Sequence, residues 1–165
     1  MSKILFLFCF AFVCCWDMGY GQKITEHNWY THPQILHIRQ QYREIQQHLA
    51  SGQISKEIRT FEHGGPYQDT EKTWFRDHEG RIRVYKKFGG SEDSALERYF
   101  YYDDKGELFF VFINGGSVNG TSIEHRIYVK EGKRIWEMKQ IIEGPGWGFP
   151  DPWPEADIEW QPVTQ

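Results

Sequence analysis

The chain has 165 residues, of which 19 are basic and 23 acidic, and its net charge is -4. A single domain typically has about 150 residues, so this length indicates one domain. The charge balance excludes a polybasic protein that binds nucleic acid or a membrane surface, and a hydrophobic content of 39% excludes gross disorder. Aromatic residues make up 17% of the chain, which is enough for an aromatic core.

Residues 1 to 21 have the pattern of a secretory signal peptide. Lys3 precedes an apolar stretch from 4 to 15, which is shorter than the roughly 20 residues that span a membrane, and a small-x-small site ends at Gly21. We expect cleavage there, a mature domain of residues 22 to 165 and a secreted or periplasmic location. This leader contains all three cysteines, Cys9, Cys14 and Cys15, so we expect no disulfide in the mature domain. The alternative is that the protein is anchored by a lipid on Cys14 or Cys15.

Residues 33 to 50 are predicted to form a helix. Thr31 with Gln34 fits an N-terminal cap, Pro33 fits the first turn, and Gly52 fits the left-handed stop. Apolar residues recur at steps of three and four, which places them on one stripe: Ile35, Ile38, Tyr42, Ile45 and Leu49. We therefore expect this stripe to pack on a single apolar surface.

An internal repeat follows the helix. Gly80, Gly106 and Gly132 lie 26 residues apart, and each ends a short polar loop between two β-rich runs. This pattern predicts three hairpins with strands near 71 to 77, 81 to 88, 96 to 103, 107 to 113, 122 to 130 and 133 to 141, and allows an extra strand near 56 to 62. Wider loops are expected at Gly89-Gly90 and Gly115-Gly116. The predicted fold is α+β, with one helix packed on an antiparallel β-meander of about six strands over residues 56 to 142.

Alternation along the strands predicts which side chains share a face. In the third hairpin it groups Ile123, His125, Ile127 and Val129 with Trp136 and Met138. In the middle hairpin it pairs Phe100 with Phe110 and places Tyr99 and Tyr101 opposite Val111 and Phe109. Both faces of the middle hairpin are apolar and need cover, so we expect the helix on one face and the tail on the other.

The tail from 144 to 165 is rich in proline and tryptophan, which favours an extended segment packed over the sheet. Any binding site is then expected at the margin of the tail. The candidate binding surface combines aromatic residues of the middle hairpin and of the tail: Tyr99, Tyr101, Trp147, Phe149 and Trp153.

No catalytic motif identifies an active site, so the catalytic residues are unknown. One helix flank carries His37, Gln41, Glu44 and His48. Its two histidines lie roughly 16 Å apart along the axis, too far to bind one ion, and the remaining two ligands do not make a structural metal site. We expect no metal and no cofactor.

The runs 124 to 136 and 97 to 108, together with the preceding helix, resemble a group of small exported Bacteroidota proteins of uncharacterised function. The resemblance is to a style of hairpin and implies a secreted or periplasmic bacterial protein, with no functional residue carried over. We expect a non-enzymatic binding or structural module of the cell envelope, with a protein or glycan partner, no nucleic acid and no transmembrane segment in the mature chain. The alternative is a hydrolase that acts on cell-wall or carbohydrate substrates through a cleft of carboxylates and histidines.

Overall fold

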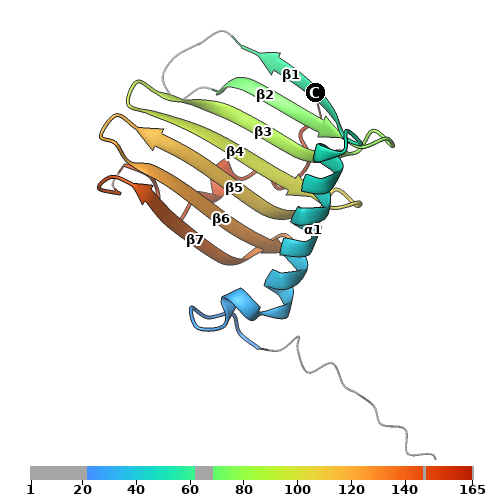
Figure 1. Cartoon of the computed structure of the whole chain (residues 1–165), viewed down its shortest axis with the longest axis horizontal. Coiled ribbons are helices and arrows are strands. Elements are labelled where there is room, and N and C mark those ends of the chain that lie inside the picture. The colour runs from blue at the N-terminus through green and yellow to red at the C-terminus, as the bar shows by residue number, and fades with distance from the viewer. Residues whose placement is uncertain (1–21, 62–68, 147, 165) are drawn as a thin grey trace, which may run out of the picture.

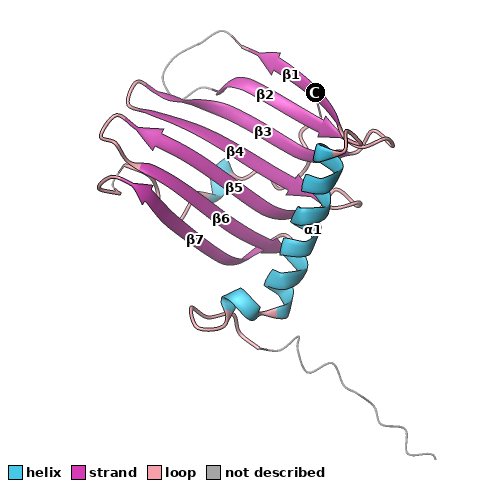
Figure 2. Ribbon diagram, viewed as in Figure 1, coloured by secondary structure: helices cyan, strands magenta, loops and turns pink. Residues whose placement is uncertain are grey.

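The computed structural model describes residues 22–61, 69–146 and 148–164. The predicted leader with its cysteines and Trp147 lie outside the described residues. One long helix, α1 (Pro33–Ala50), is followed by an antiparallel meander of seven strands (Figures 1 and 2). The strands pair in chain order: β1 (Ser55–Thr60), β2 (Asp69–Arg76), β3 (Ile82–Ser91), β4 (Ser94–Tyr102), β5 (Leu108–Ser117), β6 (Ser122–Lys130) and β7 (Lys133–Glu143). Single-turn 3-10 helices, η1 (Trp29–Thr31) and η2 (Glu155–Asp157), lie before α1 and in the tail.

The α+β meander is confirmed, but the sheet has seven strands where about six were predicted. The added strand is β1, at the position allowed for an extra strand. Gly80, Gly106 and Gly132 turn the chain between paired strands with φ of 81°, 79° and 68°, a conformation that glycine adopts without steric cost. Gly90 and Gly115 lie inside strands, not in wider loops. A Cβ on Gly90 would lie 2.0 Å from the Ser94 carbonyl oxygen, so this glycine permits a close approach of two strands.

Helix α1 has the predicted bounds, and of its predicted stripe Ile35, Ile38 and Ile45 are buried while Tyr42 and Leu49 are half-buried. Its cap is His32, whose Nδ1 accepts a hydrogen bond from the Gln34 amide at 3.3 Å, whereas Thr31 belongs to η1. The apolar stripe packs on the sheet in one core with Val84, Tyr101, Phe110 and Tyr128.

Two β-bulges change the predicted faces. In the middle hairpin Tyr102 pairs with Leu108 but Tyr101 pairs with Phe110, so the register shifts at Phe109. As a result Phe100 lies opposite Val111 and Tyr99 opposite Phe112, and the predicted pairing was wrong by one residue. In the third hairpin the register shifts at Ile135, so Trp136 pairs with Tyr128 and Met138 with Arg126, and the predicted grouping was again wrong. A bulge adds one unpaired residue and thereby reverses the alternation beyond it.

The tail runs behind the sheet, on the face opposite α1 (Figure 1). Trp153 and Ile158 are buried there in a core with Phe100, Val111 and Ile127. Two hydrogen bonds anchor the end of the tail: Trp74 Nε1 donates to the Val163 carbonyl and the Tyr102 hydroxyl to the Glu159 carbonyl, both at 2.8 Å. Among the described residues, no helix combines the length and apolarity needed to cross a membrane.

Candidate binding cleft

Helix α1 crosses the strands near one end of the sheet, and in the described part of the chain the rest of that face carries no second layer (Figure 1). A cleft lies along this open side of the helix. It consists of two cavities, of about 430 Å³ and 240 Å³, that share Tyr42 and Phe112 in their walls. Such volumes are close to those of small-ligand pockets, roughly 300 to 1,000 Å³. We call the two cavities together the aromatic cleft.

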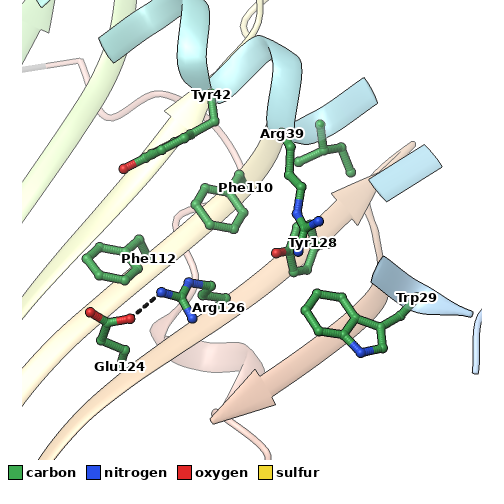
Figure 3. A pocket seen from close by; sticks show the side chains of 9 residues that line it. Trp29, Arg39, Tyr42, Phe110, Phe112, Glu124, Arg126 and Tyr128 are labelled. Carbon is green, nitrogen blue, oxygen red and sulfur yellow. Dashed lines mark hydrogen bonds and ion pairs between the residues drawn. The ribbon is translucent and has the colours of Figure 1, made fainter. Parts of the chain in front are cut away.

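Aromatic rings form the floor and walls of the larger cavity (Figure 3). Phe110 and Tyr128 are buried, with ring centroids 5.2 Å apart, and make the floor. Tyr42 of α1 packs edge-on against Phe110 at 5.3 Å, and Trp29 lies 6.4 Å from Tyr128. Phe110 pairs with Tyr128 in the regular register of β5 and β6, and the bulge at Phe109 brings Phe110 and Phe112 to the same face as Tyr101 and Tyr99 of β4.

Arg39 and Arg126 bring two guanidinium groups to this cavity. Arg39 lies over the rings of Trp29 at 4.9 Å and Tyr30 at 4.2 Å, and its Nη1 donates to the Tyr30 carbonyl at 3.1 Å. Arg126 forms an ion pair with Glu124 and lies 5.7 Å from the Phe112 ring centroid. In the part of the chain that the structure describes, no carboxylate forms an ion pair with Arg39. The cavity therefore carries one cation that the described residues do not neutralise.

Beyond the helix the open sheet face carries a paired polar network. Lys86 Nζ lies 2.6 Å from Glu97 Oε1, and the Tyr99 hydroxyl donates to Glu97 Oε2 at 3.0 Å. Burial works to raise the pKa of Glu97, but the hydrogen bonds from Lys86 and Tyr99 outweigh it and hold that pKa below its usual value. Glu97 is therefore an anion at neutral pH, which suits it to accept hydrogen bonds and not to donate a proton.

A different cavity lies on the other flank of α1, with a volume of about 480 Å³. Asp103, Glu107 and Glu131 line it together with His37, and its apolar lining includes Ile38 and Phe109 of the helix-side core. We call it the acidic pocket. The rest of the predicted helix flank, Glu44 and His48, lines a neighbouring cavity of about 280 Å³.

A buried polar cluster joins the tail to β6 and β7, and the sequence analysis missed it. His125 is fully buried, and its Nε2 lies 2.5 Å from Glu137 Oε1. That oxygen also accepts from the Trp153 amide at 2.6 Å, and Arg134 forms an ion pair with the same carboxylate. Burial lowers the pKa of His125, although the charge of Glu137 opposes this shift.

This cluster also has the spacing of a cation site, because ligand atoms of His125, Glu137 and Asp151 lie within 4.8 Å of one another. Its electrostatics disfavour a metal. Arg134 already pairs with Glu137, and Lys139 Nζ lies 3.6 Å from Asp151 Oδ2, so two positive charges would repel a metal ion. The cluster is better explained as a polar tie between the tail and the sheet.

The predicted binding surface is divided by the sheet. Tyr99 and Tyr101 line the smaller cavity of the aromatic cleft, where Tyr101 is buried and accepts a hydrogen bond from Gln46 Nε2 at 3.2 Å. Trp153 lies in the core on the opposite face, and Phe149 precedes it in the tail. Trp147, the remaining member, lies outside the described residues.

Sequence reasoning missed several residues that line the cleft. It assigned Tyr42 to the buried stripe alone and left Trp29 and Arg39 without a role. A signal was present, since an aromatic pair at 29 and 30 lies nine residues before an arginine on a helix, but only the turn of η1 brings those rings beneath Arg39.

No family model, curated protein or solved structure matches this chain. Its function is therefore inferred from these cavities and the surfaces around them.

Proposed function

We propose that this protein is a non-enzymatic binding module of the bacterial cell envelope and that its ligand is a glycan chain lying in the aromatic cleft. The observation that carries this proposal is the set of accessible rings along the cleft, from Trp29 past Tyr42 and Phe112 to Tyr99. The C–H face of a sugar ring is apolar and packs on aromatic faces, while its hydroxyls need polar partners at the edge. Asn114, Gln46 and Glu124 offer such partners beside the rings.

The shape of the cleft favours a chain over a compact ligand. Its two cavities adjoin at Tyr42 and Phe112 and follow the length of α1, from Trp29 before the helix to Leu49 near its end. An envelope location is inferred from the leader pattern of residues 1 to 21.

The residues of the cleft favour binding over hydrolysis. Glycosidases in general use two carboxyl groups that flank the scissile bond. Glu124 is the carboxylate that lines the aromatic cleft in the described part of the chain, and Arg126 pairs with it. A single neutralised carboxylate is suited to holding a hydroxyl group in place.

A direct binding measurement tests this function. Calorimetric titration of the full mature chain with neutral and acidic oligosaccharides is expected to show binding that F112A weakens about tenfold, since a lost ring contact is worth roughly 1 kcal/mol or more. The matched control is F61A, because Phe61 is an exposed phenylalanine at the end of β1, outside the cleft. Equal losses in F112A and F61A, or no glycan binding at all, would contradict the proposal.

The hydrolase remains a second candidate because of the acidic pocket, which is lined by Asp103, Glu107, Glu131 and His37. Several carboxylates and an imidazole in one cavity are the groups that acid and base catalysis uses. An assay of cell-wall and carbohydrate substrates with wild type, E107Q and the exposed control E143Q separates the cases. Turnover that E107Q abolishes and E143Q retains would favour the hydrolase over the binding module.

A further inference from the structure

We propose that the glycan is acidic and that Arg39 binds the carboxylate groups of its uronic acid residues. This inference rests on the proposed function and names the ligand class of the same cleft. It follows from the position of Arg39, the difference between Arg39 and Arg126, and the shape of a guanidinium group.

Arg39 is held in place at the wall of the larger cavity. It extends from α1 toward Tyr128 and Trp29 (Figure 3). The rings of Trp29 and Tyr30 support its guanidinium group, and the Tyr30 carbonyl takes one of its five N–H donors. The side chain therefore loses little rotamer freedom when a ligand binds, and its remaining donors are available to that ligand.

Arg126, the other arginine of this cavity, is neutralised by a carboxylate. Its Nη2 pairs with Glu124, and its Nη1 donates to Gln140 Oε1 at 3.4 Å. Arg39 has neither kind of partner in the described part of the chain and contacts only rings and a backbone carbonyl. The larger cavity thus has a surplus of one positive charge in a protein whose net charge is -4. A neutral sugar would cover this charge without pairing it, whereas an acidic sugar would neutralise it.

A carboxylate is an anion whose shape fits a single supported guanidinium group. Its two oxygens match the two parallel N–H bonds of one arginine, and a charge-assisted pair of this kind is roughly twice as strong as a neutral hydrogen bond. A uronic acid offers such a carboxylate on the same ring that packs on Phe112. One ligand residue would therefore use both the ring surface and the cation of the cavity.

Two oligosaccharides that differ in charge test the inference. One is oligogalacturonate, and the other is the same oligosaccharide with its carboxyl groups reduced to alcohols. Each is titrated into wild type, R39Q, R39K and R43Q. Arg43 is an exposed arginine on the same helix outside the cleft, so R43Q makes the same change of net charge. Thermal melting of each variant confirms that it is folded at the temperature of the titration.

We expect wild type and R43Q to bind the acidic chain about tenfold more tightly than the reduced chain. In R39Q this preference is lost, and R39K retains part of it because lysine keeps the charge without the planar fork. Added salt weakens binding of the acidic chain to wild type more than to R39Q.

Several outcomes overturn the inference, and they differ in what else they overturn. Equal affinity of wild type for both chains, or equal losses in R39Q and R43Q, rejects the role of Arg39 and leaves glycan binding intact. Tight, Arg39-dependent binding of a sulfated chain but not of the uronate rejects the carboxylate. If neither an acidic nor a neutral chain binds, the proposed function itself fails.

Discussion

The two faces of the sheet are built from alternate residues of the same strands, yet one is closed and the other is half open. Behind the sheet, the tail buries Trp153 and Ile158 on a core that extends from Trp74 in β2 to Val129 in β6. In front, α1 covers one end of the face and leaves accessible rings and charges beside it (Figure 1). The closed face contributes stability, and the open face supplies a surface for a ligand. Changes to the two faces should therefore have separable effects.

Deletion of residues 144 to 165 should have the largest effect. It removes Trp153 and Ile158 from the core and leaves the Trp74 and Tyr102 side chains without their backbone acceptors. Loss of one buried tryptophan alone costs about 3 to 5 kcal/mol, so we expect a loss on the order of 5 kcal/mol or more. Denaturant titration measures this loss, and a hydrophobic dye should bind the exposed face. An unchanged melting temperature would show that the tail does not close this face in solution.

On the front face, I45D should destabilise the protein by about 3 to 5 kcal/mol, because it buries an unpaired charge beneath α1. Ile45 is 1% exposed, whereas Leu36 on the same helix is 47% exposed. L36D is therefore the matched control and should cost less than about 0.5 kcal/mol. Similar unfolding midpoints for the two variants would mean that the helix does not dock through its stripe.

The polar tie behind the sheet should make stability depend on pH. The pKa of His125 lies below 6.5 in the folded protein. Between 6.5 and that lowered value the unfolded chain binds a proton that the folded protein does not, so stability falls as the pH falls through this window. The slope is at most about 1.4 kcal/mol per pH unit.

Melting temperatures between pH 7 and pH 5 measure this effect. H125Q should flatten the dependence, whereas H78Q, which changes an exposed histidine, should leave it as in wild type. A wild-type protein that becomes more stable toward pH 5 would indicate that the charge of Glu137, and not burial, controls His125.

Local signals in the sequence were sufficient for the helix and the turns but not for the faces of the sheet. Helix formation and tight turns depend on residues that are close together in the sequence. The apolar stripe from Ile35 to Leu49 and the glycines at 80, 106 and 132 are therefore recognisable from the local pattern. The bulges at Phe109 and Ile135 depend on how two strands fit together, and alternation along one strand does not encode that. Each moved a group of side chains to the other face, which placed Phe112 in the cleft and put Glu137 beside His125.

The smallest effect on stability and the most informative one on binding is expected for E124Q. The Glu124 and Arg126 side chains are 31% and 30% exposed, and an ion pair that water reaches is worth no more than about 1 kcal/mol. The folded protein should therefore melt almost as the wild type does.

Arg126 would lose its counter-charge, so the cleft would carry two unpaired cations in place of one. The ratio of the affinity for an acidic glycan to the affinity for its reduced form should therefore rise severalfold, with E143Q, at the end of β7, as the matched control. Titration calorimetry at low salt measures both affinities, and an unchanged ratio in E124Q would show that Glu124 does not limit binding of the acidic glycan by neutralising Arg126.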